Sequence, residues 1–110
     1  MREKLFESKL KRYLESQGIY RLGTDISVMP REPIGYYTKR HGNVFTGSGL
    51  PDMQIVVNGH CIDVELKNEK GKPSPIQEFV IEQINRSRGT ALVVRPQNFD
   101  EFKQLIGKFL

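Results

Sequence analysis

The sequence DMQIVVNGHCIDVELK, residues 52–67, decides how the rest of the chain is interpreted. Its Val and Ile residues are typical of β-strands. Asn58-Gly59 at its centre is typical of a two-residue hairpin turn, because both turn positions need a positive φ. We therefore predict a hairpin with strands over 52–58 and 60–67.

The turn also sets which residues of the two strands face each other. Residue 57 faces residue 60, and counting outward pair by pair places Asp52 opposite Glu65. Directly opposed residues have Cβ atoms about 4.5–5.5 Å apart, and like charges there destabilise a sheet. We therefore expect a positive charge between them, and carboxylate oxygens are the ligands that Mg²⁺ prefers. The alternative is a solvent-facing ion pair with Lys67, worth about 0–1 kcal/mol.

Alternation along the second strand separates its two faces. Ile62, Val64 and Leu66 are expected to point into the core, whereas Glu65 and Lys67 point the other way. Asp63 lies on the same face as Glu65, and we interpret it as a solvent-exposed residue.

The N-terminal half begins with a predicted helix over 2–17. Its apolar residues recur at helical spacing; they are Phe6, Leu10, Tyr13 and Leu14. Gly18 stands where a helix often ends. The pattern loosens between Gly18 and Gly49, where residues 19–23 (IYRLG) and 24–29 (TDISVM) are candidate strand pieces.

The C-terminal half begins with a second predicted helix, which runs to about Ser87. Ser74 is the predicted N-cap, Pro75 occupies the first helical position, and Gln77 completes a capping box. ALVV at 91–94 is a predicted buried strand.

A last helix follows, capped by Asn98 with Glu101. Its apolar face consists of Phe99, Phe102, Leu105, Ile106 and Phe109. The order of helix, strands, helix, strand and helix predicts an α/β fold.

Length, charge and composition indicate how many domains the chain has and which kinds of partner and metal site it could have. The 110 residues suit a single domain over 1–110, and 17 Lys and Arg against 13 acids give a net charge of +4, which fits a polyanionic partner. No apolar run is long enough for a membrane span, and the charged N-terminus is unlike a signal peptide, so we expect a cytoplasmic protein without a membrane partner. One cysteine, Cys61, and two histidines are too few for a zinc cluster.

Three short motifs carry a resemblance to a known family. GSGLPD at 47–52, VELK at 64–67 and SPIQ at 74–77 follow a helix that contains Glu7. At these spacings the chain resembles the VRR-NUC family of the PD-(D/E)XK nuclease superfamily. The resemblance covers residues 2–17 and 47 to about 95. It implies an αβββαβ core, with a mixed central sheet flanked by helices, and here an extra C-terminal helix.

The resemblance also implies roles for individual residues. Asp52 and Glu65 would bind Mg²⁺ or Mn²⁺ together with the backbone carbonyl of Leu66. Lys67 would orient or activate the attacking water, and Gln77 would position that lysine or water in addition to capping its helix. Glu7 would be a further acid that assists metal binding; Glu3, on the same helix, competes for this role.

The DNA-binding residues are expected mainly in the segment 24–46, which is longer than in compact members of the family that the chain resembles. Basic side chains beside aromatic rings suit contact with phosphates and stacking on bases; the candidates are Arg31, Tyr36, Tyr37, Lys39, Arg40 and, as an outsider for catalysis, His41. Gly47 and Gly49 would allow close approach to a phosphate. The alternative for this segment is a solvated loop.

The function implied by the resemblance is metal-dependent cleavage of DNA. Stand-alone members of this size resemble phage-type Holliday junction resolvases, which act as homodimers in recombination and DNA repair, in the host cytoplasm if the chain is phage-encoded. The last helix would form the dimer interface or simply cover the sheet. The alternatives are a nickase or flap endonuclease, or a DNA-binding module with a dead site.

Overall fold

The computed structural model describes residues 2–40 and 49–110, and it shows an α/β fold with three α-helices and one five-stranded mixed sheet. The elements are α1 (Glu3–Ser16), β1 (Ile19–Arg21), β2 (Gly35–Lys39), β3 (Met53–Val57), β4 (His60–Leu66), α2 (Pro75–Arg86), β5 (Ala91–Val94) and α3 (Phe99–Gly107), with short 3₁₀ turns at Ile26–Val28 and Pro96–Asn98. The strands lie in the order β1-β2-β3-β4-β5; the two outer pairs are parallel and the inner pairs antiparallel.

The β3–β4 hairpin has the predicted turn and register. Asn58 and Gly59 have φ values of 48° and 83°, as a turn with two left-handed positions requires. Val57 pairs with His60 and Met53 with Val64, so the next step outward brings Asp52 to Glu65. The register prediction is therefore confirmed.

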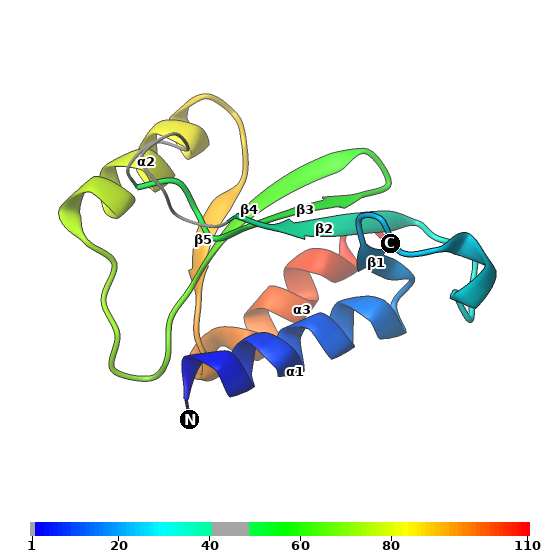
Figure 1. Cartoon of the computed structure of the whole chain (residues 1–110). Helices are drawn as coiled ribbons and strands as arrows, with labels where there is room; N and C mark the ends of the chain where they lie inside the picture. The colour runs from blue at the N-terminus through cyan, green and yellow to red at the C-terminus, as the bar shows by residue number, and fades with distance from the viewer. Residues whose placement is uncertain (1, 41–48) are drawn as a thin grey trace.

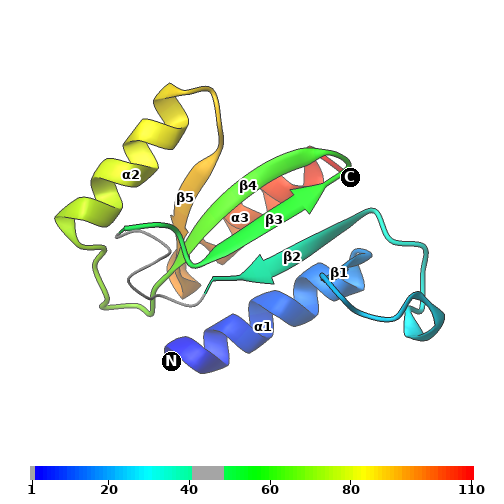
Figure 2. The same cartoon turned by 45° about the horizontal axis from the view of Figure 1, so that its top comes forward.

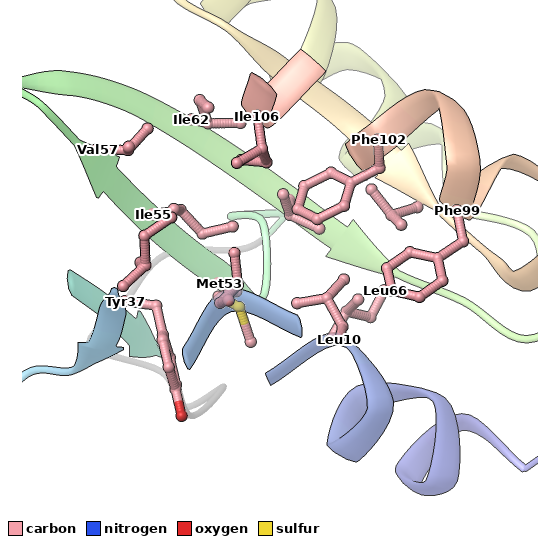
Figure 3. Close-up of a cluster of buried hydrophobic side chains, with 14 of the residues drawn as sticks. Leu10, Tyr37, Met53, Ile55, Val57, Ile62, Leu66, Phe99, Phe102 and Ile106 are labelled. Carbon is pink, nitrogen blue, oxygen red and sulfur yellow. The ribbon is translucent and has the colours of Figure 1, made fainter. Parts of the chain in front are cut away.

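The hydrophobic core lies between the sheet and two helices. Figure 1 shows α1 and α3 on one side of the sheet and α2 on the other. Ile62, Val64 and Leu66 of β4 lie in the core as predicted, and Figure 3 shows Met53, Ile55 and Leu66 packing with Leu10, Phe99 and Phe102. The amphipathic patterns of α1 and α3 are thereby satisfied by the same sheet face.

The last helix covers the sheet, which was one of its two predicted roles. Phe99, Phe102 and Ile106 are buried in the core, and Leu105 and Phe109 are partly buried against it. The apolar face that suggested a dimer interface is thus already used within the chain. Asn98 is the N-cap residue of α3, as predicted, but its side chain makes no capping hydrogen bond to the helix: its amide instead accepts a hydrogen bond from Arg95 N and donates one to Val93 O of β5.

The region before the hairpin departs from prediction in two places. Residues 24–29 do not supply a strand: Asp25 caps a 3₁₀ turn by accepting a hydrogen bond from Ser27 N. The strand lies instead at Gly35–Lys39, and a Cβ on Gly35 would lie 2.1 Å from the carbonyl oxygen of Val56. A glycine at this position therefore allows β2 to pair closely with β3.

Strand β5 matches its prediction in part. The ends of β5, Ala91 and Val94, are buried as predicted, whereas its two central residues are partly exposed. Within residues 2–40 and 49–110, no helix combines the length and apolar character that crossing a membrane needs.

Candidate metal centre

The hairpin brings two carboxylates together at the open end of the β3–β4 pair. Asp52 directly precedes β3, and its Oδ2 accepts a hydrogen bond of 3.0 Å from the backbone N–H of Leu66. This bond fixes Asp52 against the end of β4. The backbone of Leu66 therefore lies beside the carboxylate of Asp52. The resemblance implied the Leu66 carbonyl as a metal ligand together with Asp52 and Glu65.

Glu65 is buried although it faces away from the main core. Its relative exposure is 1%, and it is the one charged residue in the buried class within the described part of the chain. Its strand position points it to the side of the sheet that α2 covers, and Gln77 of α2 contacts it. The side chain is thus held between the sheet and the start of α2.

Burial and Asp52 together make Glu65 hard to ionise. Desolvation is the largest cause, followed by the neighbouring Asp52 carboxylate, and the pKa of Glu65 rises to about 7 although Lys67 acts in the opposite direction. The Oε1 atom of Glu65 is buried and receives no hydrogen bond from the residues described. A buried carboxylate oxygen without a donor is costly, and a cation would satisfy it.

Lys67 and Gln77 both approach the other oxygen of Glu65. Lys67 Nζ lies 3.5 Å from Glu65 Oε2, and Gln77 Nε2 donates a hydrogen bond of 3.2 Å to the same atom. Gln77 Oε1 accepts from the Ser74 backbone N–H, and Ser74 Oγ accepts from Gln77 N. The predicted capping box is confirmed, and the same amide also contacts the predicted site.

Arg40 holds the Pro51-Asp52 dipeptide in place. Its Nη1 donates to the carbonyl of Pro51 at 2.8 Å, and its backbone N–H donates to the carbonyl of Asp52. Its Nη2 forms an ion pair of 3.0 Å with Asp63. The prediction that Asp63 is simply solvent-exposed is wrong, because Asp63 is half-buried and anchors Arg40.

The structure does not bring Glu7 together with Asp52 and Glu65. Glu7 instead forms ion pairs with Lys11 and Lys39, and Glu3 is exposed. Among the residues for which coordinates are described, no group of three or more His, Cys, Asp and Glu side chains is arranged to hold a metal ion. Within the described residues, Asp52 and Glu65 are therefore not joined by a third acid, histidine or cysteine that could bind the same metal ion.

The predicted DNA-binding residues are spread over different environments. Tyr37 is a core residue, buried from solvent, and burial raises its pKa to about 12, so its ring is not available for stacking on a base. Tyr36 is half-buried in β2, and exposed Arg31 donates a hydrogen bond to the Ser16 carbonyl. Lys39 pairs with Glu7, as described above.

Gly49 has a structural role that the sequence did not indicate. Its φ is +82°, and a Cβ there would lie 2.9 Å from the carbonyl oxygen of Ile76, so this glycine lets the chain pass close to the start of α2. The predictions for His41 and Gly47 lie outside the described residues.

Sequence reasoning missed the Arg40–Asp63 pair, although a signal existed. Arg40 lies one residue beyond β2, and alternation from the inward-facing Tyr37 places Arg40 on the face of Asp63. That argument needed β2 to be recognised as a strand.

The donor set suits a hard divalent cation better than a soft one. Asp52 and Glu65 contribute carboxylate oxygens, and the Leu66 carbonyl belongs to the same strand end. Mg²⁺ and Mn²⁺ take oxygen ligands and complete their shells with water and phosphate. The unpartnered Oε1 of Glu65 is the atom that a metal would satisfy.

Comparisons with protein-family models, curated proteins and solved structures gave no match. The resemblance stated above therefore rests on the three sequence motifs, and it stays a prediction.

Proposed function

We propose that the chain is a divalent-metal-dependent endonuclease that hydrolyses phosphodiester bonds in branched DNA. One observation carries this proposal: Asp52 lies beside a buried Glu65 that has an unpartnered carboxylate oxygen. Burying Glu65 next to Asp52 destabilises the ionised pair. Acids with pKa values perturbed in this way cluster at functional sites. The predicted nuclease core also accounts for the order α1, β2, β3, β4, α2 and β5, with β1 as an addition.

The residues around the acid pair would each have a distinct task. Asp52, Glu65 and the Leu66 carbonyl would hold Mg²⁺ or Mn²⁺, which supplies Lewis-acid polarisation and lowers the pKa of bound water. The Gln77 amide fixes Oε2 of Glu65, which leaves Oε1 for the cation. The Lys67 ammonium lies next to this carboxylate, where it would orient the attacking water and offset negative charge that develops on the phosphate.

The substrate class follows from charge and symmetry. A net charge of +4 favours a polyanion such as DNA. The described part of the chain carries one such acid pair, whereas resolving a four-way junction needs two symmetric cuts, which a two-fold homodimer would supply. We therefore place a Holliday-type junction first, ahead of a nicked or flapped duplex.

Cleavage assays on three substrates test this function. Purified protein is incubated with a four-way junction, a flap and a plain duplex in Mg²⁺, Mn²⁺ or EDTA. Paired symmetric nicks in the junction alone are expected, and equal cutting of all three substrates would favour the nickase or flap reading.

Matched variants separate chemistry from folding. Asp52→Asn removes a proposed ligand, whereas Asp100→Asn changes an exposed residue at the start of α3 in the same way. We expect loss of cleavage in the first variant and unchanged cleavage in the second. Cleavage that persists in EDTA or in Asp52→Asn would disprove the metal mechanism, and binding without any cleavage would favour a dead DNA-binding module.

A further inference from the structure

A basic cleft lies between α1 and the carboxyl ends of β1 and β2. It has a volume of about 560 Å³. Its lining residues are Lys4, Glu7, Ser8, Lys11, Arg21 and Lys39. Four cations therefore surround one acid, and the volume is in the range of pockets that bind small ligands or parts of larger ones.

Strand alternation explains how Arg21 and Lys39 reach this cleft. Arg21 pairs with Tyr37 in the parallel β1–β2 ladder, and Lys39 lies two residues beyond Tyr37, so both share the face of that buried ring. Both strands end at these residues. The apolar face thus changes to a cationic one where the strands end, and Figure 2 shows β2 running alongside α1 at this place.

The third wall of the cleft is a polar stripe of α1. Lys4, Ser8 and Lys11 recur at helical spacing, next to the buried stripe that begins at Phe6. Ser8 donates its hydroxyl hydrogen bond to the Lys4 carbonyl. The helix therefore buries one stripe in the core and turns the adjacent one to the cleft.

Glu7 positions two of the four cations and leaves the other two free to bind. Its carboxylate pairs with Lys11 and Lys39, and these interactions lower the pKa of Glu7 against the opposing effect of burial. Lys4 and Arg21 form no ion pair with the described part of the chain. Two lysines are thus held in place while two cations still lack an anion.

The cleft lies at the same end of the sheet as the proposed metal centre, but on the opposite face. Lys39 pairs with Met53 across the β2–β3 ladder, and Asp52 is the residue before Met53. The next residue after Lys39 is Arg40, which holds the Pro51 carbonyl. A nucleic-acid strand would therefore have to pass around this end of the sheet to contact both the acid pair and the cleft.

We propose that this cleft binds backbone phosphates of the DNA strand next to the cleavage position. The inference rests on the proposed function for its substrate. Phosphodiester groups are single negative charges spaced along a chain, which matches cations distributed over three walls. A compact polyphosphate would bring several charges against Glu7, so an extended backbone fits this arrangement better.

Binding measured without cleavage tests the cleft separately from the proposed chemistry. Fluorescence anisotropy of a labelled four-way junction is recorded in EDTA over a series of salt concentrations. The double variant Lys4→Gln/Arg21→Gln removes the two unpaired cations and breaks no ion pair described here. We expect about tenfold weaker binding and a salt slope reduced by about 1–2, uniformly across DNA sequences.

Arg12→Gln is the matched control, because Arg12 is an exposed cation on the same helix outside the cleft. Its affinity and salt slope should equal those of the unchanged protein. Equal effects of the control and the double variant would overturn the proposal, as would unchanged binding in the double variant or no junction binding by the unchanged protein.

Two further outcomes distinguish the possible failures. If the double variant loses DNA affinity but the unchanged protein cleaves nothing in Mg²⁺ or Mn²⁺, the cleft stands and the proposed nuclease activity fails. If calorimetry with inorganic phosphate shows tight binding that the double variant loses, while DNA affinity stays the same, the cleft is a small-anion site and the proposal is wrong.

Discussion

Asp63 and Glu65 lie two residues apart on the same face of β4, but Asp63 faces a positive charge whereas Glu65 faces another carboxylate. Asp63 lies across from the uncharged Gln54 and pairs with Arg40 at 3.0 Å. Glu65 lies across from another acid and is more deeply buried, and its lysine partner is 3.5 Å away. Alternation decides the face of a strand residue, but its neighbours across the sheet decide its chemistry. Arg40 pairs with the carboxylate of Asp63, whereas burial and the neighbouring Asp52 destabilise the carboxylate of Glu65.

Replacing each acid by its amide should give the largest contrast in activity. Glu65→Gln removes a proposed metal ligand, and we expect cleavage to fall at least about 10³-fold, which corresponds to several kcal/mol of transition-state stabilisation. Asp63→Asn should retain cleavage within about tenfold of the unchanged protein. Single-turnover cleavage of a four-way junction in Mg²⁺ measures both, and similar losses would mean that the two acids do not differ in function.

The stability of the metal-free protein should show the cost of Glu65 directly. The pKa of Glu65 is about 7 in the folded state against an ordinary value of 4.5, so its folded state prefers the proton. This contribution to stability is complete below the ordinary value and is lost as pH rises through about 7. Glu65→Gln should therefore raise the free energy of unfolding at pH 8 by about 1–3 kcal/mol relative to the unchanged protein, but not at pH 4.

Urea unfolding in EDTA at both pH values measures this difference. Glu101→Gln, an exposed change on α3, serves as the control and should leave stability nearly unchanged at both. An equal effect of Glu65→Gln at pH 4 and pH 8 would show that ionisation of Glu65 does not strain the fold.

Metal binding should depend on pH for the same reason. A proton on Glu65, whose pKa is about 7, competes with the cation, so affinity for Mn²⁺ should rise about tenfold between pH 6 and pH 8 and level off above pH 8. Calorimetric titration at several pH values measures the change. Asp63→Asn should keep this profile and Glu65→Gln should abolish it; a flat profile in the unchanged protein would exclude Glu65 as a ligand that titrates in this range.

The sequence was sufficient for local features and insufficient for long-range pairings. The opposition of Asp52 and Glu65 followed from Asn58-Gly59 alone, because a two-residue turn fixes the register. The Ser74–Gln77 capping box was equally local. These features depend on residues that are neighbours along the chain or are linked by one tight turn.

Other features needed information that the local sequence does not contain. The role of Arg40 depends on the pairing of β2 with β3, and the burial of Tyr37 depends on the same pairing. Asn98 is the N-cap residue that its pattern predicted, but its side chain bonds to Arg95 N and to Val93 O of β5 instead of to the helix. In each case a tertiary or competing local contact overrides a plausible local pattern.

The Arg40–Asp63 pair should give the smallest effect and decides whether Asp63 serves the metal centre indirectly. Asp63→Asn leaves Arg40 with the Pro51 carbonyl as its remaining side-chain contact in the described structure. We expect a stability loss of about 0–1 kcal/mol, since the pair is partly exposed. Because Arg40 also holds Asp52 through the backbone, Mn²⁺ affinity should fall slightly, by about two- to threefold. Arg40→Lys keeps the charge but loses the forked geometry, so it should match Asp63→Asn in metal affinity if positioning is what matters. Full metal affinity in both variants would show that the pair stabilises the sheet alone and has no influence on Asp52.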